Sequence, residues 1–225
     1  MNPRIVLAAA TLQLAMALHA VAADASCAGV LKAVQAGMVQ PRIHAAIDAP
    51  LDAEAIKLGF KKTLMHSIVI DKLQYSNALD PKFQRVALAN ADERGMASDL
   101  AAFQAEHGCN ALGSARLAGR AAQVFALTTD LGRGEVTVRL WVDAASGLPL
   151  RAVTDEPDFD VDTVLQRAAK AGAKSRAQVT EKANGQRIVS THAYLYGDAV
   201  KAPGSGGTLD AQALSQLQAL LGGAP

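Results

Sequence analysis

Apolar and polar residues alternate most clearly in the middle of the chain. Between residues 119 and 153, three runs rich in β-branched and aromatic side chains are separated by two glycine-containing turns. This arrangement is typical of a three-stranded antiparallel meander. In residues 135–143, a mixed face that includes Arg139 and Trp141 alternates with an apolar face made of Val136, Val138, Leu140 and Val142. The pattern predicts a sheet whose apolar face is covered by another part of the protein.

Weaker strand patterns flank the meander. Residues 42–48 alternate Ile43, Ala45 and Ile47 with polar or small side chains. Further candidate strands are residues 55–60, 64–70, 71–77 and 83–89. After the meander, residues 174–181 and 186–196 are predicted to form a hairpin around Asn184-Gly185. On its second strand one face would carry Ile188, Ser190, His192, Tyr194 and Tyr196.

Other segments have the period of helices. They are residues 27–38, 92–106, 163–171 and 209–221. The first two are expected to cover part of the apolar face of the sheet. The last follows a flexible linker at residues 202–207 and carries a stripe of Leu214, Leu217 and Leu221. Such a stripe suits either a helix packed on the body or a mobile cover over a groove, and the sequence leaves both open.

The N-terminus has the three parts of a secretory signal peptide. Arg4 precedes an apolar run over residues 5–18, and small residues follow. The run is too short for a permanent transmembrane anchor. We therefore expect a periplasmic protein with a cleaved signal peptide at residues 1–25 and no membrane anchor afterwards. One domain over residues 26–203 and a linker with a C-terminal helix or tail over residues 204–225 would complete the chain.

The charge and composition of the chain bear on which ligands or partners it can bind. The chain has 22 basic and 21 acidic residues, so loss of Arg4 with the signal peptide would leave the charges balanced. The sequence has no basic patch, which argues against a nucleic-acid partner. Half of the residues are hydrophobic but only 4 % are aromatic. Any cavity in such a protein would be lined mainly by aliphatic side chains.

Cys27 and Cys109 are the two cysteines of the chain. In an oxidising compartment, a single pair most simply forms one disulfide. Two alternatives are weaker. Lipidation of Cys27 is disfavoured by the acidic Asp24 before it, and a thiol nucleophile at Cys109 beside His107 lacks a supporting motif.

The search for catalytic and metal-binding motifs finds none of the common ones. The acidic residues 158–162 match the start of a calcium loop, but Thr163 stands where the loop needs glycine and Ala169 where it needs glutamate. The histidines after the leader, which are His44, His66, His107 and His192, are scattered. We therefore predict a protein that is not an enzyme and has no metal site or cofactor.

Residues 140–151, Leu-Trp-Val-Asp-Ala-Ala-Ser-Gly-Leu-Pro-Leu-Arg, resemble a signature of the periplasmic lipoprotein-carrier superfamily. Its relatives include LolA, LolB, LppX-type lipid carriers and the anti-sigma-factor regulator RseB. The signature residues are Trp141, Asp143, Gly147, Leu148 and Pro149, of which Asp143 and Gly147 would shape a turn. Residues 194–203 resemble the closing strand of the family. Over about residues 27–203, the resemblance implies an α+β fold: a strongly curved antiparallel sheet, an open half-barrel, covered on its concave face by helices.

The resemblance also implies a site and a function. The cavity candidates are Ile43, Ile47, Ile68, Val138, Leu140, Val142 and Tyr194. Arg42 is the candidate for the arginine that latches the lid helices in the carrier proper. The implied function is a soluble, non-catalytic periplasmic binding protein for a lipid, a lipoprotein acyl chain or a similar amphiphile. The alternative is a cell-envelope sensor or interaction module that contacts a protein partner, as in sigma-factor regulators. An apolar, partly empty cavity would favour the first, and a filled core with an exposed apolar patch the second.

Overall fold

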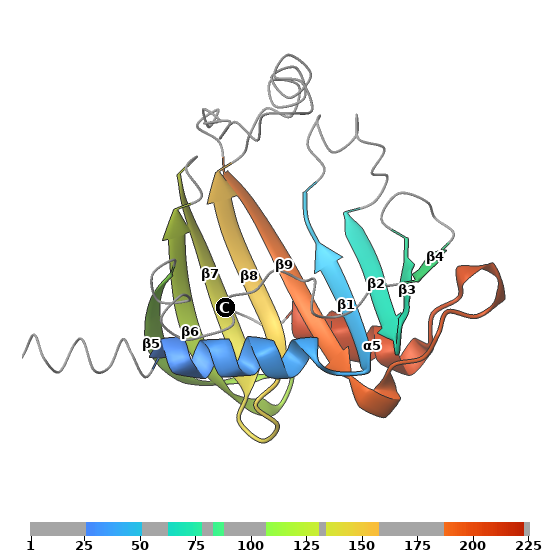
Figure 1. The fold of residues 1–225 in the computed structure, drawn as a ribbon, viewed down its shortest axis with the longest axis horizontal. Coiled ribbons are helices and arrows are strands. Elements are labelled where there is room, and N and C mark those ends of the chain that lie inside the picture. The colour runs from blue at the N-terminus through green and yellow to red at the C-terminus, as the bar shows by residue number, and fades with distance from the viewer. Residues whose placement is uncertain are drawn as a thin grey trace, which may run out of the picture.

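One curved antiparallel sheet dominates the computed structural model, which describes residues 26–50, 63–77, 83–87, 107–130, 134–157 and 187–222. In these residues the sheet has nine strands, in the order β4-β3-β2-β1-β9-β8-β7-β6-β5, and it is open between β4 and β5 (Figure 1). The strands are β1 (Arg42–Asp48), β2 (Leu64–Ile70), β3 (Leu73–Ser76), β4 (Gln84–Ala87), β5 (Gly108–Leu117), β6 (Arg120–Asp130), β7 (Glu135–Asp143), β8 (Pro149–Pro157) and β9 (Arg187–Tyr196). The predicted open, curved antiparallel sheet is confirmed.

The predicted meander is β6-β7-β8, in which each strand pairs with the next one along the chain. The far edge of the sheet, β5, is not predicted by the sequence pattern, which instead indicates a helix leading up to Cys109 and strands from residue 119 onwards. The residues of β5 are mainly glycine, alanine, asparagine and serine, which have low strand propensity. The strand is mostly exposed and is held by its ladder with β6, which is interrupted by a bulge between Ala111 and Gly113. Pairing with a neighbour, rather than local preference, therefore makes this segment a strand.

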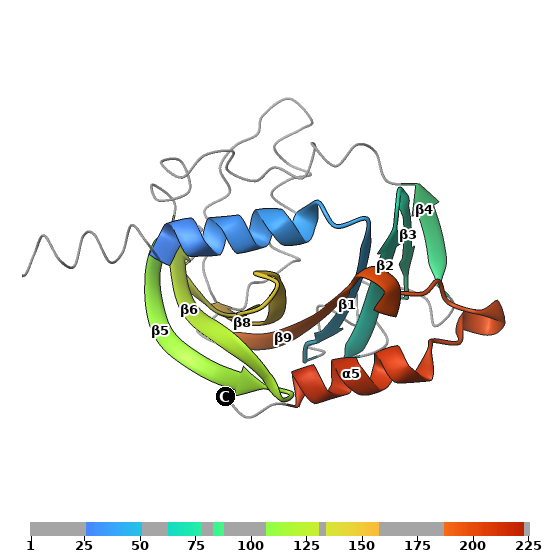
Figure 2. The same ribbon diagram turned by 90° about the horizontal axis from the view of Figure 1, so that it is seen from below.

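The two faces of the sheet pack against different helices. The N-terminal helix (residues 26–38) packs through Val30 and Leu31 against the face that carries Leu140 and Val142. Figure 2 shows this helix across the concave side of the sheet. The second helix expected there, residues 92–106, lies outside the described residues, so a concave face covered by several helices stays a prediction.

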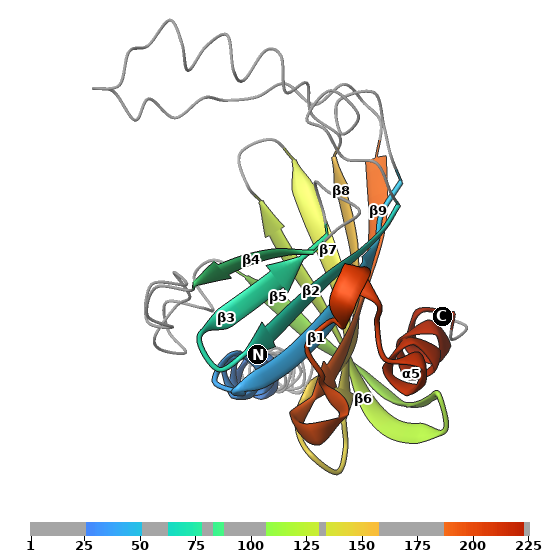
Figure 3. The same cartoon turned by 90° about the vertical axis from the view of Figure 1, so that its right-hand side faces the viewer.

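The C-terminal helix α5 (Ala211–Leu221) packs on the opposite face, as Figure 3 shows. Its buried residues are Ala213, Leu217 and Leu220. They contact a cluster that includes Ile68, Trp141 and Leu195. The helix therefore packs on the body instead of covering the groove. The predicted leucine stripe was partly wrong, because Leu214 and Leu221 are only half-buried and the helix is turned to bury Ala213 and Leu220. The fully buried small residues Ala46 and Ala193 belong to the same cluster.

Several predicted features lie outside the described residues. They are the signal peptide, the candidate strand at residues 55–60, the helices at 92–106 and 163–171, the first strand and turn of the hairpin, and the acidic residues 158–162. Within the described ranges, no helix is both long enough and apolar enough to cross a membrane. The same ranges contain no group of three or more side chains placed to hold a metal ion.

The predicted disulfide between Cys27 and Cys109 is present. It joins the first turn of the N-terminal helix to β5, and Cys27 is buried in the same cluster as Phe125 and Leu127 of β6. The helix is therefore fixed to the sheet covalently at its beginning. At its other end it continues through a short connection into β1.

Two histidines that the sequence left unconnected form a buried pair on neighbouring strands. Nε2 of His44 on β1 lies 3.1 Å from Nδ1 of His66 on β2. The side-chain oxygen of the buried Asn77 accepts a hydrogen bond from the backbone N–H of His66 at 2.7 Å. Burial, and then the proximity of His66, lowers the pKa of His44 to about 4. The folded protein therefore holds His44 in its neutral form at neutral pH.

This pair predicts a loss of stability in mild acid. Because the pKa of His44 is lower in the folded than in the unfolded protein, its neutral form favours folding above about pH 6.5, and this contribution is lost as the pH falls towards about 4. The slope for one such group is at most about 1.4 kcal/mol per pH unit. Urea unfolding at a series of pH values in this window should show the decline.

The variant His44→Gln is the control for this prediction, because glutamine has no side-chain group that ionises at position 44. Its stability should change less with pH in the same window, even if it is lower at pH 7. Burial also lowers the pKa of His192, but that residue is present in both proteins, so its contribution cancels in the comparison. If the free energies of unfolding of the two proteins changed with pH in the same way, the loss of stability could not be attributed to His44.

Candidate ligand cavity

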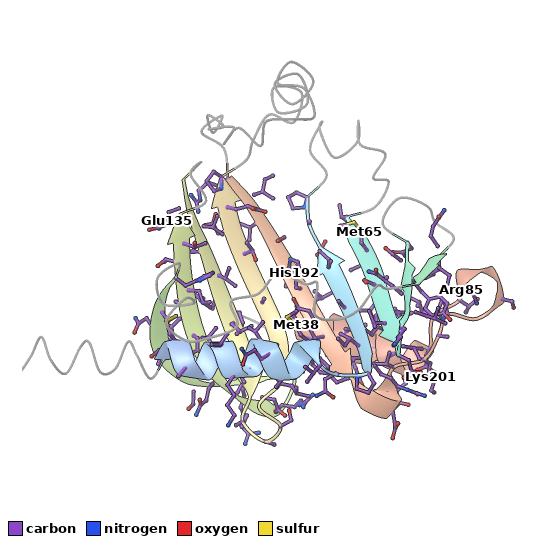
Figure 4. All side chains as sticks on the ribbon, in the orientation of Figure 1. Met38, Met65, Arg85, Glu135, His192 and Lys201 are labelled. Carbon is purple, nitrogen blue, oxygen red and sulfur yellow. A yellow bond between two sulfur atoms is a disulfide. The ribbon has the colours of Figure 1, made fainter. Side chains whose placement is uncertain are left out.

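A cavity of about 340 Å³ lies between the N-terminal helix and the concave face of the sheet. The helix supplies Val34, Gly37 and Met38 to its lining. Met38 on the helix and His192 on β9, both labelled in Figure 4, belong to opposite walls. The cavity is therefore lined by segments far apart in the sequence.

Gly37 allows the N-terminal helix to lie close to Pro149 and Tyr196 in the cavity lining. A Cβ atom at this position would lie 3.2 Å from the hydroxyl oxygen of Tyr196 and 3.2 Å from Cδ of Pro149. These distances are tighter than ordinary van der Waals contact, so a larger residue would push the helix outwards. The absence of a side chain at Gly37 therefore determines how near the last turn of the helix lies to β8 and β9.

Strands β6, β7 and β8 provide an aliphatic wall. Leu127 pairs with Val138, and Leu140 pairs with Ala152, so that these four residues form two cross-strand pairs on one face. Ile43 of β1 continues the apolar lining on the other side of β9. Branched side chains on neighbouring strands pack well on a pleated surface, which explains why this wall is built from them.

Strand β9 contributes a row of aromatic rings to the cavity. His192, Tyr194 and Tyr196 alternate along the strand, and successive ring centroids lie 6.5 Å apart with interplanar angles of 24° and 22°. Oγ of Ser190 lies 3.2 Å from Nε2 of His192, within hydrogen-bond distance. Burial raises the pKa of Tyr194 to about 12. Burial, and then the proximity of Tyr194, raises the pKa of Tyr196, while burial lowers that of His192. All three rings are neutral near pH 7 and suit hydrogen bonding rather than proton transfer.

The structure brings four of the seven predicted cavity residues together: Ile43, Val138, Leu140 and Tyr194 line the cavity. Val142 and Ile47 share this face of the sheet, where they pair with Pro149 and His192.

Ile68 lies elsewhere. It pairs with His44, which alternates with Ile43 along β1, and it is fully buried in the cluster beneath α5. The same alternation puts Arg42 on the face opposite to Ile43, so the latch candidate is not brought to the cavity.

Several residues that line the cavity are not predicted from the sequence. The helix residues Val34, Gly37 and Met38 could not be assigned, because helical spacing does not show which strands a helix contacts. Thr154 of β8 and the pair His192 and Tyr196 of β9 also line the cavity. The shared face predicted for residues 188–196 already grouped these two with Tyr194, and that grouping was the available signal.

The signature residues build the β7–β8 turn. The carboxylate of Asp143 accepts hydrogen bonds from the backbone N–H of Ser146 at 3.1 Å, from its hydroxyl at 2.6 Å and from Arg120 at 2.8 Å. Burial alone would raise the pKa of Asp143, but these bonds lower it overall. Gly147 adopts a φ of 70°, and the carbonyl of Leu148 accepts from the N–H of Asp143. Only Pro149 of this group reaches the cavity, whereas Trp141 is buried in the cluster beneath α5.

Comparison with known proteins finds similarity in structure only. No family model matches the chain, and no curated protein matches it. LppX, a lipoprotein of Mycobacterium tuberculosis, is similar with a TM-score of 0.46 and 10 % identity over 79 % of this chain and 97 % of LppX. LprF of Mycobacterium bovis has a TM-score of 0.42 and 13 % identity over 80 % of this chain and 96 % of LprF.

A third similar structure is MucB, with a TM-score of 0.36 and 12 % identity over 83 % of this chain and 63 % of MucB. MucB has also been solved in complex with MucA, including the Pseudomonas aeruginosa proteins. LppX is one of the proteins that the sequence resemblance named. At these identities the similarity concerns the fold alone.

Proposed function

We propose that this protein binds a lipid, an acyl chain or a similar amphiphile in the cavity between the N-terminal helix and the sheet, without catalysing a reaction. The observation that carries this proposal is the cavity of about 340 Å³ with a mainly aliphatic lining. Small-molecule sites typically measure about 300–1,000 Å³ and are lined mostly by apolar groups with a few polar ones. The periplasmic location and the removal of residues 1–25 belong to the same proposal.

The alternative function, an envelope module that contacts a protein partner, would need an exposed apolar patch. Among the described residues, the large hydrophobic side chains that are most exposed are Val39, Leu112 and Val189. They belong to the turn after the N-terminal helix, to β5 and to β9, so they lie on separate segments. This distribution favours the ligand-binding proposal.

Replacing Val138 with asparagine should weaken amphiphile binding about tenfold. Val138 lines the cavity, and full burial of a valine side chain is worth about 1.5–3 kcal/mol, while each 1.4 kcal/mol changes a dissociation constant tenfold. Binding of pyrene-labelled fatty alcohol and fatty acid to the delipidated protein would be measured by fluorescence titration. The matched control is Val189→Asn on β9, whose side chain is 51 % exposed.

The affinity of the uncharged probe should change little between about 0.01 and 1 M salt, over which the Debye length falls from about 30 to 3 Å. Native mass spectrometry of the protein purified without delipidation should show a bound mass of lipid size. If no amphiphile binds, and chemical crosslinking instead recovers an envelope protein, the interaction module becomes the better explanation.

A further inference from the structure

A row of uncharged hydrogen-bonding side chains crosses the otherwise aliphatic cavity. It consists of His192, Tyr194 and Tyr196 on β9 together with Thr154 on the neighbouring strand β8. Four residue steps separate His192 from Tyr196, so the row extends about 13 Å along the strand. On the β1 side, Ile43 pairs with Tyr196 and Ala45 with Tyr194, so an apolar flank runs beside the row. Strand β9, which carries most of the row, therefore lies between β1 and β8 in this wall.

Three hydroxyl groups of this polar row are available to a ligand. In the part of the chain that the structure describes, the hydroxyls of Thr154, Tyr194 and Tyr196 make no hydrogen bond to protein, whereas Nε2 of His192 is engaged by Ser190. Tyrosine and threonine hydroxyls both donate and accept. A partly buried hydroxyl without a partner loses free energy that a ligand oxygen or nitrogen can restore. The row is therefore placed to bind a polar head group.

The surroundings of the row disfavour charge. Burial raises the pKa of Tyr194 to about 12, raises that of Tyr196, and lowers that of His192, so each of the three rings is shifted towards its neutral form. A charged group on a ligand would meet the same loss of hydration there. Among the described lining residues, none is an arginine, lysine, aspartate or glutamate that could compensate it.

We propose that the cavity selects an uncharged single-chain amphiphile, with an alcohol, amide or glycerol-ester head group bound by Tyr194 and Tyr196, over an anionic amphiphile of the same chain length. This specificity rests on the proposed function. A single chain follows from the volume of about 340 Å³, near the lower end of the range for ligand sites. The tail lies against Leu127, Val138 and Leu140, and the head contacts the β9 hydroxyls.

The test is a competition experiment on the delipidated full-length mature protein. A pyrene-labelled fatty alcohol is displaced by a monoacylglycerol, a fatty acid and a lysophosphatidic acid of equal chain length, all below their aggregation concentrations and at pH 8. We expect the monoacylglycerol to bind at least tenfold more tightly than either anion. Equal or tighter binding of the anions would overturn the specificity and leave the proposed function standing. Failure of all four to bind would overturn both.

Variants locate the selectivity on the polar row. Tyr194→Phe and Tyr196→Phe keep the rings and remove the hydroxyls, and each should weaken monoacylglycerol binding about three- to tenfold. Both variants should leave the affinities of the two anions nearly unchanged, so the preference should shrink. The matched control is Tyr75→Phe, since Tyr75 pairs with Ile68 on the opposite face of the sheet. Unchanged monoacylglycerol affinity in both cavity variants would overturn the role of the row, even if the preference for uncharged ligands were present.

Discussion

Replacing Cys27 and Cys109 together with serine is expected to lower the free energy of unfolding by about 4 to 5 kcal/mol. The disulfide joins residues 82 positions apart, and a cross-link that closes a loop of this length restricts the unfolded chain by about that amount in the chain-entropy model. Both ends also lie in or against the hydrophobic cluster beneath the N-terminal helix. Urea unfolding of the oxidised protein and of the double variant, followed by circular dichroism, would measure the difference.

The reduced wild-type protein is the control for this prediction. It should unfold at nearly the same urea concentration as the double serine variant, because both lack the same cross-link. Since the disulfide anchors the helix that lines the cavity, both proteins should also bind the amphiphile probe more weakly than the oxidised form. A double variant as stable as the oxidised protein, or two free thiols in the unreduced protein, would contradict the prediction.

The substitution Leu217→Ala should lower the free energy of unfolding by about 2 to 5 kcal/mol. The side chain of Leu217 is 1 % exposed and packs between α5 and the sheet, in the cluster that contains Ile68 and Leu195. Leucine-to-alanine changes at such buried positions cost this much, because apolar contact is lost and a cavity remains. Chemical denaturation at neutral pH is the appropriate measurement.

Gln216→Ala is the matched control on the same helix. Gln216 is exposed, so its loss should change the stability by no more than about 0.5 kcal/mol. Because α5 lies on the face away from the cavity, folded Leu217→Ala should bind the amphiphile probe with unchanged affinity. Equal and small effects of the two changes would mean that α5 does not pack on the sheet in solution.

Local patterns in the sequence predicted most strands of the sheet and part of the site. The two-residue period identified β1, β2 and the meander, and it placed Leu140 and Trp141 on opposite faces. It also grouped His192, Tyr194 and Tyr196 on one face of β9, which is where the structure has them. Strand β5 was not predicted, because its residues have low strand propensity and become a strand by pairing with β6.

By itself, the sequence determined the alternation within the strands of the meander, β1 and β9, the amphipathic character of the two terminal helices and the pairing of the two cysteines. The alternation and the amphipathic character depend on residues that are near one another in the sequence. The cysteine pairing follows because each cysteine has a single possible partner. The tertiary structure alone decided that β1 pairs with β9, that Ile68 and Ile43 lie on opposite faces, and that α5 packs on the face away from the cavity. The reason is physical: a period of two determines which residues of one strand share a face. Which faces of different strands join, and which helix covers them, depends on the register between segments far apart in the chain.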